Sequence, residues 1–175
     1  KIMLHYYKEQ GGDEMLKRKA YDKLSDWKKQ KNKKSTFITG ARQIGKTTLI
    51  REFAKNNYAN FVEINFITED GAADIFSGSL DADTLITNIT AFTRKSLVDG
   101  DTLILFDEIQ QCPNARTAIK FLVEDGRFDY VESGSLLGVG YNHVKSFPVG
   151  FEEIYRMYPM DLRNIFGRTG FKPAR

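Results

Sequence analysis

The stretch of sequence that decides the fold spans residues 38–50. It reads Ile38-Thr39-Gly40-Ala41-Arg42-Gln43-Ile44-Gly45-Lys46-Thr47-Thr48-Leu49-Ile50. Residues 40–47 match G-x-x-x-x-G-K-[ST] at every required position, which is the pattern of a phosphate-binding loop. In such a loop the glycines allow a tight turn and a close approach to an anion, and main-chain N–H groups converge on phosphates before the positive end of a helix. The sequence therefore predicts a nucleotide site at residues 40–48.

The side chains of this loop have different predicted tasks. Lys46 is expected to reach the β- and γ-phosphates, and the hydroxyl of Thr47 is expected to hold Mg²⁺. The side chains of Arg42 and Gln43 are expected to face solvent or a partner. The predicted cofactor-binding set is Gly40, Ala41, Arg42, Gln43, Ile44, Gly45, Lys46, Thr47 and Thr48.

The segments on either side of the loop have the order that the motif requires. Residues 35–39 are mostly β-branched or aromatic, which is typical of a strand. Residues 46–55 place Leu49, Ile50 and Phe53 at helical spacing. A strand, a phosphate-binding loop and a helix in this order predict an α/β fold with a parallel sheet.

Length and composition predict one soluble globular domain. The chain has 175 residues, of which 41% are hydrophobic and 28% are charged. No apolar run approaches the roughly 18 residues of a membrane span, and the first residues lack the apolar region of a secretory signal, so we expect a cytoplasmic protein. One cysteine and two histidines cannot build a disulfide or a zinc cluster. Any metal is therefore expected to be Mg²⁺ that accompanies a nucleotide.

The charge is uneven along the chain. Residues 1–34 hold eleven Lys or Arg against five Asp or Glu. Residues 1–12 show no periodic pattern and are interpreted as a flexible leader or an expression remnant. Asp13 is expected to cap a helix that runs to about Gln30, with apolar residues on one face and lysines on the other. The basic face either binds a nucleic-acid backbone or is simply solvated.

A second motif follows the loop by about 60 residues. Residues 102–106 are largely apolar, which is typical of a buried parallel strand, and such strands carry functional groups at their carboxyl ends. Asp107 and Glu108 come directly after this run. Asp107 is expected to hold the Mg²⁺ shell, and Glu108 is expected to orient and deprotonate the attacking water.

The other elements are expected from periodicity and turn signals. Asp81 or Asp83 is expected to begin a helix that Gly100 ends, and residues 68–78 to form a connector. The other expected elements are strands at 61–66, 128–133 and 152–157, and helices at 113–126 and 161–166. Ser133 and Ser135 follow a strand, so either could place a hydroxyl beside the γ-phosphate as a catalytic sensor group, or could simply form a turn.

Several segments together resemble one family, the bacterial and archaeal AAA-type ATPases that are usually described only as ATP-binding proteins. They are residues 40–47, 103–110, 133–138, 146–150 and 157–160, with a similar basic opening at 16–29. The resemblance spans about residues 15–167. It implies a three-layer sandwich with a parallel sheet of strand order 5-1-4-3-2, in which Glu108 is the catalytic glutamate and the sensor strand lies between the strands of the two Walker motifs.

Two features depart from the family pattern. Members often have a basic residue after Pro-Val-Gly, where this chain has Phe151, so no arginine finger is assigned. The family's ATPase core is also normally followed by a long second domain. We therefore expect residues 13–167 to be the ATPase core and residues 168–175 to be a tail or a truncated linker to a domain that this chain lacks.

The sequence thus predicts an ATPase core that binds ATP with Mg²⁺ and hydrolyses it slowly. Lys46, Glu108, Ser133 and Ser135 are the candidate catalytic residues, and Thr47 and Asp107 are the candidate metal ligands.

One alternative is a fragment of a nucleic-acid motor, because residues 107–110 resemble a helicase DExx box. Another is a nucleotide-gated binding module that orders a surface for a protein partner without turnover. A GTPase is disfavoured because no N-K-x-D segment occurs. The oligomeric state does not follow from the sequence.

Overall fold

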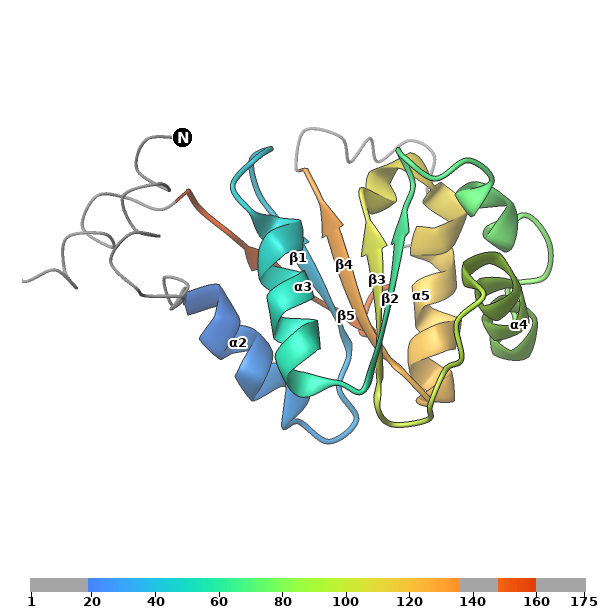
Figure 1. Cartoon of the computed structure of the whole chain (residues 1–175), viewed down its shortest axis with the longest axis horizontal. Coiled ribbons are helices and arrows are strands. Elements are labelled where there is room, and N and C mark those ends of the chain that lie inside the picture. Colours follow the sequence, from blue (N-terminus) through green and yellow to red (C-terminus); the bar gives the residue numbers. More distant parts are fainter. Residues whose placement is uncertain (1–18, 136–147, 160–175) are drawn as a thin grey trace, which may run out of the picture.

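A five-stranded parallel sheet forms the centre of the protein (Figure 1), a computed structural model in which residues 19–135 and 148–159 are described. The strands are β1 (Ser35–Thr39), β2 (Asn60–Asn65), β3 (Thr102–Asp107), β4 (Asp129–Gly134) and β5 (Glu152–Arg156). Their spatial order is β2-β3-β4-β1-β5, and every pair is parallel. This confirms the predicted order 5-1-4-3-2. The expected leader, the short helix at 161–166 and the tail lie outside the described residues.

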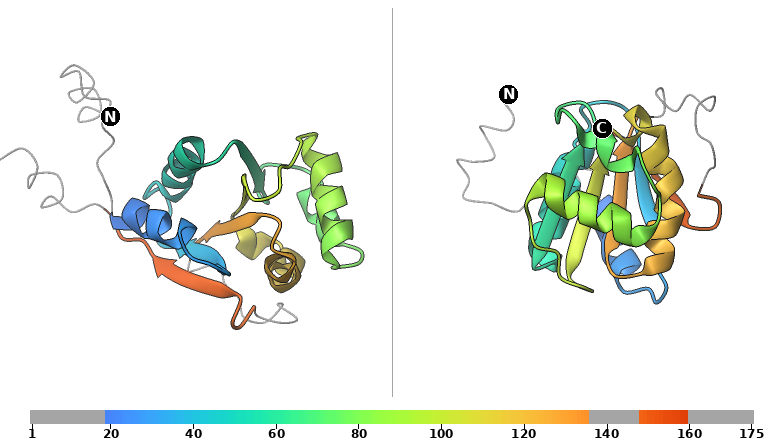
Figure 2. Two further views of the ribbon diagram at one scale, coloured as in Figure 1. Left: turned by 90° about the horizontal axis from the view of Figure 1, so that it is seen from below. Right: turned by 90° about the vertical axis from the view of Figure 1, so that its right-hand side faces the viewer.

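Helices cover both faces of the sheet, so the architecture has three layers (Figure 2). One face packs against α2 (Lys19–Lys28) and α3 (Lys46–Asn57), and the other packs against α4 (Ala82–Thr93) and α5 (Pro113–Asp125). No helix in the described ranges is long and apolar enough to cross a membrane.

The central strand β3 shows why the run of apolar residues in the sequence was informative. All six of its residues are buried. Leu103 and Leu105 pack into the core beneath α2 and α3, whereas Ile104 and Phe106 pack into the core beneath α4 and α5. Successive side chains of a strand point to opposite faces, so a strand that is covered on both sides is apolar throughout.

Helix α4 begins as predicted but ends earlier. The side chain of Asp81 caps it by accepting a hydrogen bond of 2.9 Å from the backbone N–H of Thr84. The helix ends at Thr93, and Arg94 is in the left-handed conformation (φ 54°), so the predicted end at Gly100 is wrong. The hydroxyl of Thr102 holds the following segment in place, because it exchanges hydrogen bonds of 2.8 and 2.9 Å with the backbone of Val98.

The predicted connector at 68–78 contains a short 3-10 helix, η1 (Ala72–Phe76). Ala72, Ile75 and Phe76 of this helix are buried in the core beneath α4 and α5. The run is too short to show a helical period, which explains why the sequence did not reveal it.

The basic surface near α2 is partly used within the molecule. Lys28 donates to the backbone carbonyl of Asn57 and lies 3.8 Å from the centroid of the Tyr58 ring. Lys33, in the loop that follows α2, forms an ion pair of 3.0 Å with Asp129 at the start of β4. These lysines therefore contribute to packing, and nucleic-acid binding by this surface stays a prediction.

A buried ionic cluster joins β4, β5 and α5. Arg116 Nη1 lies 2.9 Å from Glu132 Oε2 and 2.7 Å from Glu152 Oε1, and the three side chains are 5%, 0% and 7% exposed. The hydroxyl of Ser35 donates to Glu132 at 2.9 Å, and the guanidinium lies 4.3 Å from the Phe37 ring centroid. Burial raises the pKa of Glu132 well above its usual range, and repulsion from Glu152 raises it further.

We expect the two ends of this cluster to respond differently to substitution. Arg116→Met leaves two carboxylates buried without their cation and should reduce the free energy of unfolding by about 3–5 kcal/mol. Glu132→Gln keeps the shape and removes the excess negative charge, so its loss should be much smaller. Urea unfolding of both variants at pH 7 measures the difference, and equal losses would contradict it.

The pH dependence of Glu132→Gln tests the same cluster. Because the folded pKa of Glu132 is raised above the ordinary value of 4.5, unfolding releases a proton between the two pKa values, and stability falls as the pH rises through that window. The amide that replaces this carboxyl group in the variant has no such proton. The stability of the variant relative to the parent should therefore increase as the pH is raised above 4.5, and a constant difference would exclude a raised pKa.

Candidate functional site

The phosphate-binding motif folds into the loop between β1 and α3, at the carboxyl edge of the sheet (Figure 1). Gly45 is the N-cap of α3 in the left-handed conformation (φ 82°), and no side chain caps the first turn of this helix. The first N–H groups of a helix lack partners within it and carry a partial positive charge. The start of α3 can therefore receive an anion, as the motif predicts.

Gly40 is a glycine because a backbone carbonyl approaches it. A methyl group on Gly40 would lie 2.3 Å from Met157 O and 2.8 Å from Ile44 Cδ1. Met157 follows β5 and is fixed by a hydrogen bond of 2.7 Å from its N–H to Thr39 O. Met157, directly after β5, therefore packs against the first turn of the loop. The sequence motif requires this glycine but does not show its neighbour.

The side chain of Lys46 lies back across the loop. Its Nζ donates to Ala41 O at 2.9 Å and to Gly40 O at 3.2 Å, and the residue is 6% exposed. Burial lowers the pKa of Lys46, while the nearby carboxylates of Glu108 and Asp107 oppose this shift. The ammonium group is thus held beside the loop by two backbone carbonyls, those of Gly40 and Ala41.

Asp107 is the meeting point of four elements. Thr47 on α3 donates from its hydroxyl to both carboxylate oxygens at 3.2 Å, and Ser133 on β4 donates to Oδ1. Asn65, the last residue of β2, donates from Nδ2 to Oδ2 at 3.0 Å. The structure therefore brings together both candidate metal ligands, Thr47 and Asp107, and one of the two candidate sensor serines.

Asn65 is the residue of this group that sequence reasoning missed. Its Oδ1 also accepts the backbone N–H groups of Ile67 and Thr68 at 2.9 and 3.0 Å, so the side chain is held from both sides. A polar residue at the carboxyl end of a strand was the available signal. The predicted strand order already places β2 beside β3, but it does not show that the side-chain amide of Asn65 faces Asp107.

Glu108 follows Asp107 in the left-handed conformation, with φ 55°. For a residue with a side chain this conformation costs about 1–2 kcal/mol, and such strain is concentrated at functional sites. Glu108 is half-buried, and its Oε2 accepts a hydrogen bond from Gln110 Nε2. The carboxylate is thus held close to Asp107, on the turn between β3 and the next short helix.

The remaining predicted residues lie at the rim of the site. Ala41, Arg42, Gln43 and Thr48 are exposed, so only their backbone groups are placed by the loop. Ser135 is buried one residue beyond β4, but the hydroxyl that bonds to Asp107 is that of Ser133. The geometry therefore distinguishes between the two serines that the sequence left equal.

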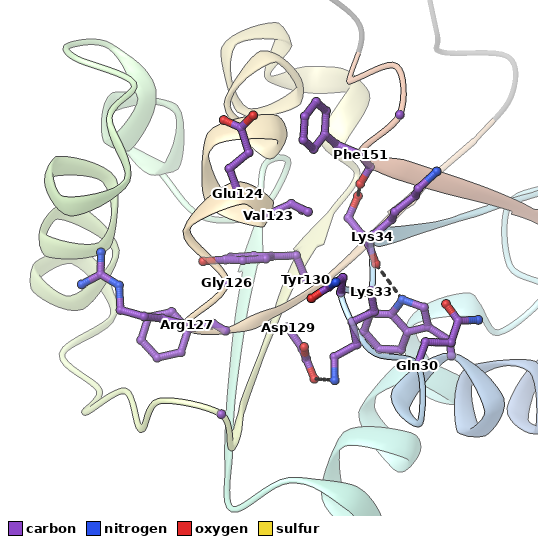
Figure 3. Close-up of a pocket in the computed structure, with 16 residues that line it drawn as sticks. Gln30, Lys33, Lys34, Val123, Glu124, Gly126, Arg127, Asp129, Tyr130 and Phe151 are labelled. Carbon is purple, nitrogen blue, oxygen red and sulfur yellow. Dashed lines mark hydrogen bonds and ion pairs between the residues drawn. The ribbon is translucent and has the colours of Figure 1, made fainter.

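A cavity of about 530 Å³ lies at the opposite edge of the sheet (Figure 3). Its wall includes Lys34, Asp129, Tyr130 and Phe151, which lie at or near the amino ends of β1, β4 and β5. None of the phosphate-loop residues lines it. This cavity is therefore separate from the candidate nucleotide site.

Comparison with known proteins agrees with the motifs. The family model described as AAA domain matches residues 32–166, which is more than three quarters of the chain. The match contains the phosphate loop, Asp107, Glu108 and all five strands. No curated protein matches the chain.

Gly40→Ala should disturb the loop by adding a methyl group at its first turn, without replacing any candidate catalytic side chain. The new methyl group would overlap Met157 O, and overpacking of this kind costs about 1–3 kcal/mol. We expect a lower melting temperature and weaker nucleotide binding, measured by thermal unfolding and calorimetry. Gly78→Ala is the matched control, because nothing lies within 4 Å of its new methyl group. If both substitutions behave alike, the contact with Met157 has no role in shaping the loop.

Proposed function

The chain belongs to the AAA domain family and is a P-loop nucleotide-binding core of the ATPase type, and on that premise we propose that it binds MgATP at residues 40–48 and hydrolyses it. The single observation that carries the proposal is the convergence at Asp107. Groups from the phosphate loop, β2, β3 and β4 meet at one carboxylate, at the edge of the sheet where the helix α3 begins. A structural role alone would not require a cation, a hydroxyl and two acids beside an uncapped helix.

The residues present fit a magnesium ion. Thr47 and Asp107 offer a hydroxyl and a carboxylate 3.2 Å apart, and Mg²⁺ prefers such oxygen ligands together with phosphates and water. When bound, the ion would neutralise charge that develops on the transferred phosphoryl group. Asn65 and Ser133 hold the carboxylate of Asp107 in one orientation, so the ligand is positioned before the nucleotide arrives.

The proton chemistry is assigned to Glu108. The residue lies next to Asp107 at the carboxyl end of β3. A positioned carboxylate can orient a water molecule and accept its proton. Lys46 and the loop N–H groups would stabilise the phosphate oxygens, and Ser133 is the proposed sensor because its hydroxyl already faces this group of residues.

Phe151 stands where members of the family often have a basic residue, and it lies away from the phosphate loop. Phe151 accepts from Ser35 N at 2.9 Å through its backbone carbonyl, and it lines the cavity at the opposite edge of the sheet (Figure 3). Its side chain therefore is not placed at the phosphate loop of the same molecule. An arginine finger, which is worth about 10³ to 10⁵ in rate, would have to come from another position or another chain. This supports slow hydrolysis.

Two acids with different tasks give a sharp test. Glu108→Gln keeps the shape but loses the base, so it should bind MgATP as tightly as the parent and lose roughly a hundredfold or more in turnover. Asp107→Asn should weaken MgATP binding as well as turnover, because a ligand charge is lost beside the metal. Calorimetry gives the affinities, and phosphate release gives the rates.

The outcome also separates the rival functions. A parent that binds MgATP without turnover would favour a nucleotide-gated binding module. Turnover that is stimulated by single-stranded DNA would favour a nucleic-acid motor, in which the basic surface near α2 tracks the backbone. A Glu108→Gln variant with the parental rate would remove Glu108 from the catalytic set.

A further inference from the structure

Gln110 is held between the two motifs that form the site. It lies in the short helix η2 (Ile109–Gln111), directly after Asp107 and Glu108. The turn is closed by a hydrogen bond of 3.0 Å from Gln111 N to Glu108 O, so the side chains of Glu108 and Gln110 lie on one tight turn. From there Gln110 Nε2 donates to Glu108 Oε2. Neither the sequence motif nor the proposed mechanism gives Gln110 a role.

The other end of the same amide rests on β4. A methyl group on Gly134 would lie 2.4 Å from Gln110 Oε1, which is buried and has no hydrogen-bond partner within the described part of the chain. The amide therefore occupies the space that any other residue at position 134 would need. Gly134 directly follows Ser133, the donor to Asp107. The strand that carries the sensor serine thus also forms the seat of Gln110.

We propose that Gln110 is a positioning residue for Glu108, and that Gly134 is a glycine because it seats the Gln110 amide; the inference rests on the proposed hydrolysis of ATP. The orientation of the amide follows from chemistry, because a carboxylate only accepts hydrogen bonds and must face the NH₂ end. Gln110 restrains Oε2 and leaves the other oxygen of Glu108 for the attacking water. A misplacement of the base by about 1 Å can cost as much as a hundredfold in rate.

Substitutions at Gln110 separate hydrogen bonding from packing. Gln110→Met keeps the volume and loses the donor, whereas Gln110→Ala loses both. If Gln110 positions Glu108, both variants should lose about tenfold to a hundredfold in kcat, with MgATP affinity unchanged. Gln111→Ala, one residue along and exposed, is the matched control and should keep the parental kcat.

A double-mutant cycle tests the seat. Gly134→Ala should displace the amide and lower kcat and the melting temperature together. In the Gln110→Ala background the clash with Oε1 is gone, so Gly134→Ala should lower the melting temperature by about half as much or less, and kcat should fall no further. Part of the decrease in melting temperature is expected to remain, because two carbons of the Phe37 ring would lie 3.2 and 3.3 Å from the new methyl group.

The outcomes separate this inference from the proposed function. If the parent hydrolyses ATP and the Gln110→Met variant keeps the parental kcat, the positioning role is wrong and the proposed ATPase activity is unaffected. Additive losses in the cycle would overturn the seat at Gly134. A parent without turnover would overturn the proposed hydrolysis, and the positioning role with it.

Discussion

The candidate site depends on the carboxylate of Asp107, which accepts hydrogen bonds from Thr47, Asn65 and Ser133. These partners come from α3, β2 and β4, so one side chain joins the phosphate loop to both neighbours of β3. This is possible only because the strands are parallel and their carboxyl ends share one edge of the sheet. The fold therefore brings the ends of β2, β3 and β4 together beside the phosphate loop, which is the arrangement that the proposed hydrolysis requires.

Two glycines beside the site each admit a close neighbour. Gly40 admits the carbonyl of Met157, and Gly134 admits the amide of Gln110. Interiors are packed closely enough that an added methyl group at such points must displace a neighbour. The buried cluster at Arg116 joins β5 to β4 through Glu152, the first residue of β5, and Glu132, which directly precedes Ser133 on β4. The edge strand β5 is thereby tied to the nucleotide site.

The sequence predicted what depends on local pattern. The phosphate loop followed from its motif, β3 from its apolar run, and the strand order from the family resemblance, and the structure confirms the order. The sequence did not predict the contacts that form between side chains from different elements. The predicted strand order places β2 beside β3 but does not show that the Asn65 amide donates to Asp107. Helix α4 ends at Thr93, where Arg94 adopts the left-handed conformation and no glycine marks the end. The buried pairing of Arg116 joins residues from three elements, which no local period records.

The central claim is that this edge of the sheet binds MgATP through the phosphate loop. Calorimetric titration of the chain and of Lys46→Ala with MgATP tests it most directly, because Lys46, whose ammonium group lies against the loop carbonyls of Gly40 and Ala41, is the cation proposed to bind the phosphates. The account predicts measurable binding by the parent and an affinity at least about tenfold lower for the variant, which corresponds to about 1.4 kcal/mol. Equal affinities, or no binding by the parent, would contradict it.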